Sequence, residues 1–358
     1  MVKWLVDCTL EYFLRNIKED KIIAFGAGRK FIEFVTRHKL ENNIEFVLDN
    51  FKIGTIDING KIIEILPPEK LFLNNTKEIR LLITNTYNIS EILRQIDSMK
   101  MFEGCDCYIC ALMLENANNQ KIEYTRGMDK IPKIIHYCWF GKKEIPDHLK
   151  RYMESWNRIC DDYEIKRWDE SNYDISKNEY MRQAYISKKW GFVPDYARLD
   201  IIYQNGGIYL DTDVEVTKKF DDLLKDESFM GFNDNSDVAL GLGFGAVKGN
   251  KIIKYMMEEY DNVKFINEDG SFNLKICSEY QMPVLKRMGF EDNGLFQKID
   301  GNVLYPMEVF NPCGKIGIYN HFTDNTHSIH RSELSYETDV NKKGYRDRDY
   351  IKERVLKF

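Results

Sequence analysis

Hydrophobic positions in the first third of the chain alternate between two spacings, one typical of buried strands and one of amphipathic helices. Short apolar runs bounded by glycine, proline or asparagine predict strands, and apolar residues three or four positions apart predict helices. The predicted strands lie within 21–28, 44–50, 60–71, 78–86 and 107–114, and the predicted helices within 3–20, 29–40 and 88–101. Strands that alternate with helices predict a parallel α/β sheet over about the first 112 residues.

The alternation stops and then starts again in the second part of the chain. Residues 115–130 are polar and without periodicity, which predicts a linker. Beyond it, strand patterns lie at 131–141, 163–168 and 206–216, and helical patterns at 148–160, 181–190 and 194–205. The sequence therefore predicts an α/β domain at 1–114, a linker at 115–130, a second α/β domain at 131–340 and a C-terminal tail at 341–358.

Composition narrows the class of protein. The chain has 358 residues, and 43% of them are hydrophobic, which is enough for two packed cores. The net charge of −6 gives no general attraction to nucleic acid. The sequence lacks a signal peptide and a transmembrane-length apolar segment, and its eight cysteines are scattered. These features predict a cytoplasmic protein with reduced thiols.

Two local patterns have competing interpretations. Cys105, Cys107 and Cys110 crowd into six positions without a companion pair, so we expect buried core residues and not a zinc site. Gly26 and Gly28 follow a strand, and Asp49 lies about 20 residues further on, as in a dinucleotide-binding unit. Phe31 stands at the third glycine position, so bound NAD is only a minor alternative.

A buried strand pattern runs directly into two carboxylates in GGIYLDTDVEV (206–216). In a strand, Asp211 and Asp213 would point to the same face, where two close carboxylates repel each other unless a cation binds them. Mg²⁺ or Mn²⁺ is the natural partner, since these ions take oxygen ligands and substrate phosphates. The alternative is a solvated strand end whose aspartates cap a turn.

The helix pattern before this strand adds two charged candidates. Pro194 suits its first turn, and Gly206–Gly207 suits its end. Asp195 and Arg198 are three positions apart, so the helix places them on one face. Arginine beside a metal site suits phosphate or sugar hydroxyls, and the alternative is a surface ion pair.

The segment VPDYARLDIIYQNGGIYLDTDVEV (193–216) resembles the DXD-containing glycosyltransferases of the sugar-binding, capsular-polysaccharide and yeast outer-chain mannosyltransferase type. It is also similar to the glucosyltransferase domains of clostridial toxins. The likeness extends to IPKIIHYCWFG, RWDESNYD and HSIHRSELSY, so it covers about 130–336. It implies an α/β fold in which a GT-A-type nucleotide-sugar-binding domain follows a smaller Rossmann-like domain. Residues 46–60 resemble Rossmann-like domains attached to polysaccharide-biosynthesis enzymes.

The resemblance implies a role for individual residues. Trp139 would stack on the nucleotide base, Asn172 would bind sugar or ribose, and Tyr209 would contact the nucleotide. Asp195 and Arg198 would hold sugar hydroxyls, and Asp211 and Asp213 would bind the metal. Asp195, Arg198, Asp211 and Asp213 would be the catalytic residues.

The C-terminal motif HRSELSY implies further ligands. His330 would reach the metal or pyrophosphate, and Ser335 would bind phosphate. The family commonly has a second aromatic residue or histidine where this chain has Arg331, and tryptophan where it has Tyr336. His327 is a competing candidate for the role of His330.

The resemblance implies a retaining, metal-dependent glycosyltransferase that uses a nucleotide-diphosphate sugar, with UDP favoured through the likeness to the toxins, and a saccharide or lipid-linked saccharide acceptor. Double displacement and a front-face mechanism both remain open. A non-catalytic sugar-nucleotide-binding protein and an NAD-dependent oxidoreductase are the alternatives. A haloacid-dehalogenase-type phosphatase ranks low, because Glu215 stands where it needs Thr or Val. The tail 341–358, with seven basic and three acidic residues, suggests peripheral contact with the inner membrane face, or a solvated helix.

Overall fold

A computed structural model of the chain describes residues 2–5, 8–17, 20–70, 79–85, 89–110, 112–113, 122–233, 237–312 and 323–331. These residues fall into two compact units, one within 1–119 and the other within 120–314 and 319–337. The division falls between 119 and 120, inside the predicted linker at 115–130. The exact domain boundaries at 114 and 131 stay predictions. The predicted tail and Ser335 lie outside the described residues.

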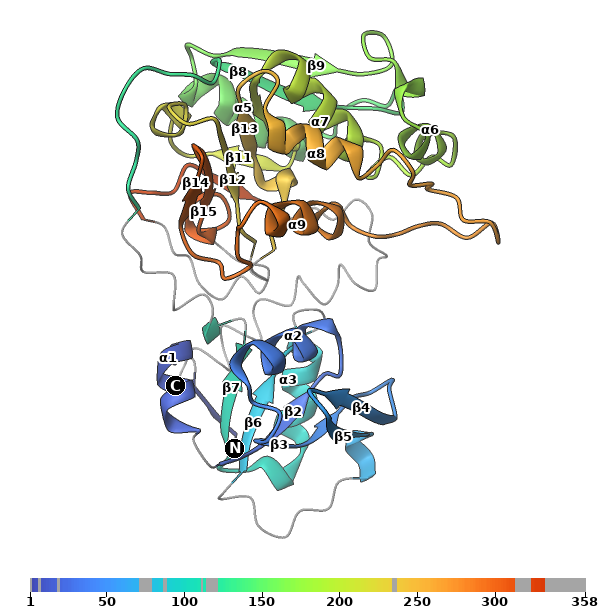
Figure 1. Cartoon of the computed structure of the whole chain (residues 1–358), viewed down its shortest axis with the longest axis vertical. Helices are drawn as coiled ribbons and strands as arrows, with labels where there is room; N and C mark the ends of the chain where they lie inside the picture. The colour runs from blue at the N-terminus through green and yellow to red at the C-terminus, as the bar shows by residue number, and fades with distance from the viewer. Residues whose placement is uncertain are drawn as a thin grey trace. The chain divides into compact units, whose positions relative to one another are not determined.

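The first unit is built on one seven-stranded sheet in the order β1-β7-β6-β2-β3-β5-β4, and every pair is parallel except β4 with β5. Helices α1 and α2 pack on one face through Phe13, Phe31 and Val35, which join Ala24 and Leu82 of the strands. The elements are β1 (Lys3–Trp4), α1 (Leu10–Asn16), β2 (Lys21–Phe25), α2 (Arg29–His38), β3 (Ile44–Leu48), β4 (Gly54–Ile58), β5 (Lys61–Leu66), β6 (Ile79–Ile83), α3 (Ile89–Ser98) and β7 (Asp106–Ile109) (Figure 1).

Three local predictions in this unit are wrong. The predicted helix at 3–20 starts late, because Lys3–Trp4 pairs with β7 and α1 begins only after Thr9, whose hydroxyl accepts from the Tyr12 N–H (3.1 Å). The strand predicted at 107–114 ends at Ile109. Strand β4 was not predicted, because it is a short, mostly exposed edge strand with only two apolar side chains, Ile56 and Ile58.

The second unit has a mixed seven-stranded sheet in the order β14-β15-β12-β13-β10-β8-β9, and a separate two-stranded sheet of β11 with β16. The strands are β8 (Ile134–Cys138), β9 (Glu164–Trp168), β10 (Gly207–Tyr209), β11 (Val214–Val216), β12 (Ser228–Gly231), β13 (Phe244–Ala246), β14 (Gln297–Ile299), β15 (Asn302–Tyr305) and β16 (Ser328–His330). The helices are α5 (Asp147–Ile159), α6 (Glu179–Ile186), α7 (Pro194–Asn205), α8 (Lys251–Glu258) and α9 (Cys277–Arg287). The predicted α/β alternation is thus confirmed.

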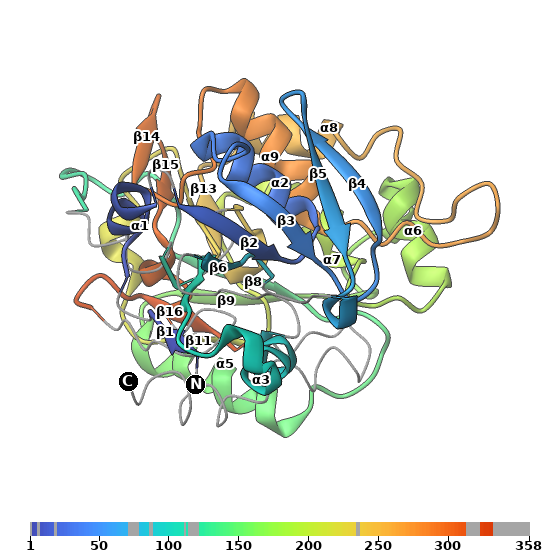
Figure 2. The same cartoon turned by 90° about the horizontal axis from the view of Figure 1, so that it is seen from below.

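Two cores lie on opposite faces of this sheet. Successive residues of β10 alternate between them, with Ile208 in one and Tyr209 in the other. The first core contains Trp156 of α5, and the second contains residues of α6, α7, α8 and α9. Figure 2 shows β11 and β16 beside α5, away from the other four helices.

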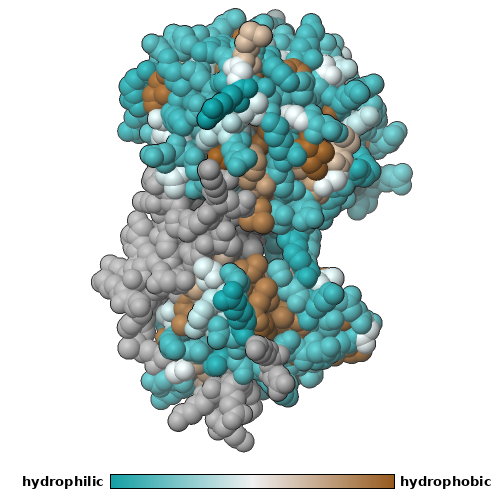
Figure 3. Space-filling model, turned by 60° about the vertical axis from the view of Figure 1, so that its left-hand side comes forward, coloured by the Kyte–Doolittle hydropathy of each residue, from teal (hydrophilic) through white to brown (hydrophobic). Residues whose placement is uncertain are grey.

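Two properties that bear on membrane contact are surface hydropathy and helix length in the part of the chain that the structure describes. Figure 3 shows a mostly hydrophilic face with separate hydrophobic patches. Among the described helices, none combines the length and the apolar character needed to cross a bilayer.

Candidate active site

The two aspartates of the DXD sequence lie on a turn and not in a strand. Strand β10 ends at Tyr209, and β11 begins at Val214. The Val214 N–H donates to the carbonyl of Asp211 (3.1 Å), which closes the turn that carries Asp211 and Asp213. The predicted reason for their convergence, a shared strand face, is therefore wrong, because the chain turns to form a second small sheet.

That small sheet brings the C-terminal histidine to the carboxylates. Strand β11 pairs with β16 in antiparallel register, with Val214 opposite His330. The backbone N–H of Arg331 donates to the carbonyl of Asp213 (2.9 Å), which extends the pairing to the DXD turn. On the other side, the buried indole of Trp156 donates to the carbonyl of Val214 (2.8 Å). Helix α5 and β16 together fix the position of the turn.

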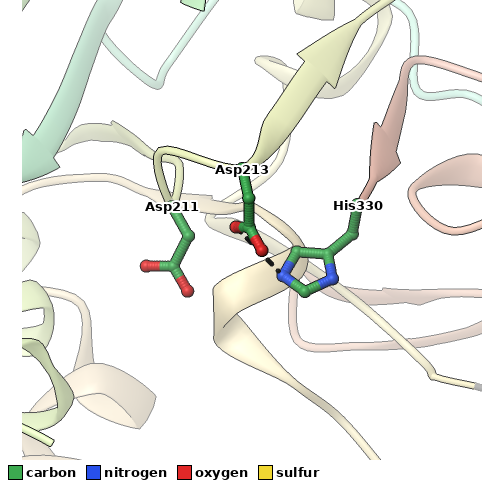
Figure 4. Close-up of side chains that lie close together, drawn as sticks. All are labelled: Asp211, Asp213 and His330. Atoms are coloured by element: carbon green, nitrogen blue, oxygen red, sulfur yellow. Dashed lines mark ion pairs between the residues drawn. The ribbon is translucent and has the colours of Figure 1, made fainter. Parts of the chain in front are cut away.

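Asp211, Asp213 and His330 offer ligand atoms that all lie within 4.8 Å of one another. Nε2 of His330 is 3.4 Å from Oδ1 of Asp213, and Figure 4 shows both carboxylates and the imidazole turned toward a common space. Two carboxylates and one imidazole fit a divalent cation that keeps open positions for substrate oxygens. The chemistry of this donor set suits Mn²⁺ or Mg²⁺.

Asp195 and Arg198 meet as their spacing predicts. Nη2 of Arg198 is 3.1 Å from Oδ1 of Asp195, and both residues are buried, so the alternative of a surface ion pair is wrong. The same Nη2 is 3.6 Å from Oδ1 of Asp211, and the guanidinium carbon lies 5.2 Å from the centre of the Tyr209 ring. Arg198 thus links the helix that precedes the turn to the first carboxylate on it.

The buried carboxylates around Arg198 carry more negative charge than this one arginine balances. Burial raises the pKa of Asp195 to about 7, while Arg198 lowers it and Asp211 raises it further. Burial and the neighbouring charge of Asp213 raise the pKa of Asp211, against the lowering effect of Arg198. Because Asp195 and Asp211 share Arg198 and Asp213 adds a further negative charge beside Asp211, a bound cation would stabilise the ionised carboxylates.

Gly241 is a site residue that the sequence reasoning missed. It lies in the short 3₁₀ helix Leu240–Leu242, where a Cβ would be 2.5 Å from Oδ2 of Asp211 and 3.3 Å from Nη1 of Arg198. This helix also contacts β16, which carries His330. The alternating glycines at 241, 243 and 245 were the available signal, since glycine in a buried segment often marks a close approach.

Trp139 and Asn172 follow the ends of β8 and β9, and their predicted roles in donor binding stay predictions. Trp139 is half-buried, and its indole donates to the carbonyl of Lys143 (2.6 Å). Asn172 uses both ends of its amide in the turn after β9: Oδ1 accepts from the Asp169 N–H (2.9 Å) and Nδ2 donates to the Arg167 carbonyl (2.9 Å). In this structure Asn172 stabilises its own turn.

Two histidines near the motifs have structural contacts. His327 is fully buried, with Nδ1 2.7 Å from the Asn325 carbonyl and a ring that stacks on Phe220. It is therefore not a ligand beside His330. His136 is also fully buried: Nε2 lies 3.0 Å from the Gly206 carbonyl and its Nδ1 accepts from the indole of Trp168 (3.0 Å).

The glycine turn of the first unit has its own structural explanation. A Cβ on Gly26 would lie 1.4 Å from the Asn85 side chain. The carboxylate of Asp49 accepts the Ala27 N–H (2.8 Å) and the N–H groups of Phe51 (2.9 Å) and Lys52 (3.0 Å). These three hydrogen bonds occupy the Asp49 carboxylate, which is the group that would bind the ribose of NAD, so they disfavour an NAD site.

Cys105, Cys107 and Cys110 are buried as predicted.

Residues 146–230 match the family described as glycosyltransferase sugar-binding region containing DXD motif. The recognition of a DXD-type glycosyltransferase region is confirmed. The predicted fold class, a GT-A-type domain preceded by a smaller Rossmann-like α/β domain, agrees with the two sheets and with this match.

Two curated yeast proteins are similar to part of the chain. Inositol phosphoceramide mannosyltransferase 3 of Schizosaccharomyces pombe is 28% identical over 158 residues, which is 43% of this chain and 44% of that protein. Mannosyl phosphorylinositol ceramide synthase of Saccharomyces cerevisiae is 32% identical over 104 residues, 28% of this chain and 27% of that protein. The chain thus spans less than half the length of these relatives.

A solved structure, the PaToxG glycosyltransferase, aligns over 44% of this chain and 69% of its own, with 19% identity and a TM-score of 0.37. A likeness at that score carries no argument about function.

Proposed function

We propose that this protein is a metal-dependent glycosyltransferase that moves a sugar from a nucleotide-diphosphate sugar to a saccharide or lipid-linked saccharide. The observation that carries the proposal is the convergence of Asp211, Asp213 and His330, with ligand atoms within 4.8 Å, next to the buried Asp195–Arg198 pair. A divalent metal held by these three residues would neutralise the diphosphate leaving group as a Lewis acid.

Different side chains of the site would contact different parts of the donor. As the bond from the anomeric carbon to phosphate breaks, negative charge develops on the diphosphate, and Arg198 would stabilise it electrostatically. Asp195, 3.1 Å from Arg198, would accept hydrogen bonds from sugar hydroxyls. Trp139, half-buried at the end of β8, would stack on the base, with Asn172 and Tyr209 as further donor contacts. Ser335 would bind phosphate.

The proposed identities of the donor and the acceptor rest on the resemblance to DXD-containing glycosyltransferases and on the names of the yeast relatives. We propose a UDP-sugar donor, retention of anomeric configuration and a role in surface or capsular polysaccharide synthesis at the inner face of the membrane. The Schizosaccharomyces pombe relative is named an inositol phosphoceramide mannosyltransferase, so we include GDP-mannose and a lipid-linked acceptor among the substrates to be tested.

The main alternative is a protein that binds the nucleotide sugar without turning it over, since each named residue serves binding as well as catalysis. An NAD-dependent oxidoreductase is disfavoured, because Asp49 already accepts three backbone N–H groups.

The deciding experiment measures the heat of binding of UDP and GDP with and without Mn²⁺, for the wild type and Asp213→Asn. We expect Mn²⁺-dependent binding of one nucleotide and its loss in the variant. Release of the nucleotide from UDP-glucose, UDP-galactose or GDP-mannose in the presence of acceptor then separates the enzyme from the binding protein. Absence of nucleotide binding under every condition would overturn the proposal.

A further inference from the structure

Strands β11 and β16, which position two of the side chains of the proposed metal site, have only three residues each. Asp213 directly precedes β11, and His330 is the last residue of β16. A two-stranded sheet is marginally stable in water unless it packs against other elements or its side chains pair across it. The distance between Asp213 and His330 therefore depends on contacts beyond the backbone ladder.

An ion pair between side chains crosses this small sheet. Nε of Arg331 lies 3.0 Å from Oε2 of Glu215, and Nη2 donates to the same oxygen. Glu215 pairs with Ile329 in the register, so Arg331 is its diagonal neighbour, a separation that long side chains bridge. The side chains of Arg331 and Glu215 are 33% and 28% exposed, so water screens this pair less than a fully exposed one.

Each partner of the pair adjoins a residue of the proposed metal site. Arg331 directly follows His330, and its backbone N–H donates to the carbonyl of Asp213 (2.9 Å). Glu215 lies two positions after Asp213, on the other strand. The ion pair thus connects the segment that carries His330 to the segment that carries Asp213, at the end of the sheet that adjoins the DXD turn.

Helix α5 supports both the strand and the arginine. The hydroxyl of Ser155 accepts the N–H of Val216 (2.8 Å), which fixes β11 along the edge opposite β16. The guanidinium carbon of Arg331 lies 5.7 Å from the centre of the Tyr152 ring, within the range of a cation–π contact. Arg331 therefore contacts both β11 and α5 through its side chain.

We propose that Glu215 and Arg331 are positioning residues, which hold Asp213 and His330 at the separation that a divalent cation requires. This inference rests on the proposed function and adds to it two residues outside the DXD motif. Arg331 stands where the family that this chain resembles commonly has a second aromatic residue or histidine, so the pair is a feature of this chain. The pair is neutral as a whole, so we expect it to act on the metal through position and not through added charge.

The test measures Mn²⁺ affinity without nucleotide, together with the melting temperature, for Arg331→Gln, Glu215→Gln and the double variant. Each single variant should bind Mn²⁺ about 10-fold more weakly than the wild type, because a residue that orients a metal ligand typically contributes about 10- to 100-fold to affinity. The double variant should stay within about 3-fold of the weaker single variant, since the second substitution has no remaining pair to break. This non-additivity distinguishes one shared interaction from two separate contributions.

Arg287→Gln is the matched control. Arg287 of α9 forms an ion pair with Glu259 at the C-terminal end of α8, so the substitution breaks the same kind of pair between two helices that carry neither the DXD aspartates nor His330. It should keep Mn²⁺ affinity within about 2-fold of the wild type, whatever its effect on the melting temperature. The comparison separates a positional effect on the metal site from a general loss of stability.

Arg331→Lys serves as the second variant if Arg331→Gln does not fold. Lysine keeps the positive charge but lacks the planar group whose two N–H donors reach Glu215, so Mn²⁺ affinity should fall about 3- to 10-fold. Wild-type Mn²⁺ affinity in a folded Arg331→Gln, Glu215→Gln or Arg331→Lys protein would overturn the inference, as would additive losses of about 100-fold in the double variant. Wild-type protein that binds neither Mn²⁺ nor nucleotide would instead overturn the proposed function.

Discussion

The close approach of Gly241 to Asp211, the first carboxylate of the proposed metal site, leads to a quantitative prediction for Gly241→Ala. A Cβ at this position would lie 2.5 Å from Oδ2 of Asp211, whereas ordinary contacts begin at 3.4 Å, so one of the two groups must move by up to 0.9 Å (3.4 − 2.5). Neither moves easily: Leu240 and Leu242 are 0% and 4% exposed, and Arg198 holds Asp211 at 3.6 Å.

The size of the effect follows from the tolerance of metal coordination. Metal–ligand distances vary by only about 0.2 Å, so a displacement several times larger misplaces the carboxylate. Disturbed support of a ligand typically lowers metal affinity about 10- to 100-fold, or about 1.4–2.7 kcal/mol. Overpacking of the buried turn would cost about 1–3 kcal/mol of stability as well.

The assay is a Mn²⁺ titration in the presence of UDP or GDP, with the melting temperature measured in parallel. Gly28→Ala is the matched control, because its Cβ would have no atom within 4 Å and its φ of −89° suits alanine. The control should retain wild-type affinity. A folded Gly241→Ala protein with unchanged Mn²⁺ affinity would refute the steric argument.

Three further predictions concern residues that support the site. His330→Ala should lower Mn²⁺ affinity about 10-fold or more in the same titration, whereas His327→Ala should mainly lower the melting temperature; the reverse pattern would contradict the assignment of His330 as the ligand. Trp156→Phe removes the bond to the Val214 carbonyl and should lower the free energy of unfolding in urea by about 2–4 kcal/mol, and an unchanged midpoint would count against α5 as the anchor of β11. Burial lowers the pKa of His136 from 6.5 to about 4, so its neutral form stabilises the fold above pH 6.5, and this contribution is lost as the pH falls toward 4. Denaturation between pH 7 and 4.5 should show that the wild type loses about 2–3 kcal/mol more than His136→Gln, and equal losses would disprove it.

The local pattern of the sequence determined much of the fold. Apolar spacing with Pro194 at one end and Gly206–Gly207 at the other defined α7, and it placed Asp195 and Arg198 on one face. These features depend on neighbours within one or two turns, so the sequence alone carries them. Where a long-range partner decided the conformation, the prediction failed: Lys3–Trp4 became a strand only because β7 lies beside it.

The site shows the same division between local and long-range causes. The sequence selected Asp211 and Asp213 because two adjacent carboxylates after an apolar run need a cation. The resemblance favoured His330 over His327, and only the tertiary structure supplies a physical reason, since the register of β16 against β11 puts His330 opposite Val214. The tertiary structure also showed why residue 241 is glycine, since a Cβ there would lie 2.5 Å from Oδ2 of Asp211, and the glycine pattern of the sequence does not name this partner.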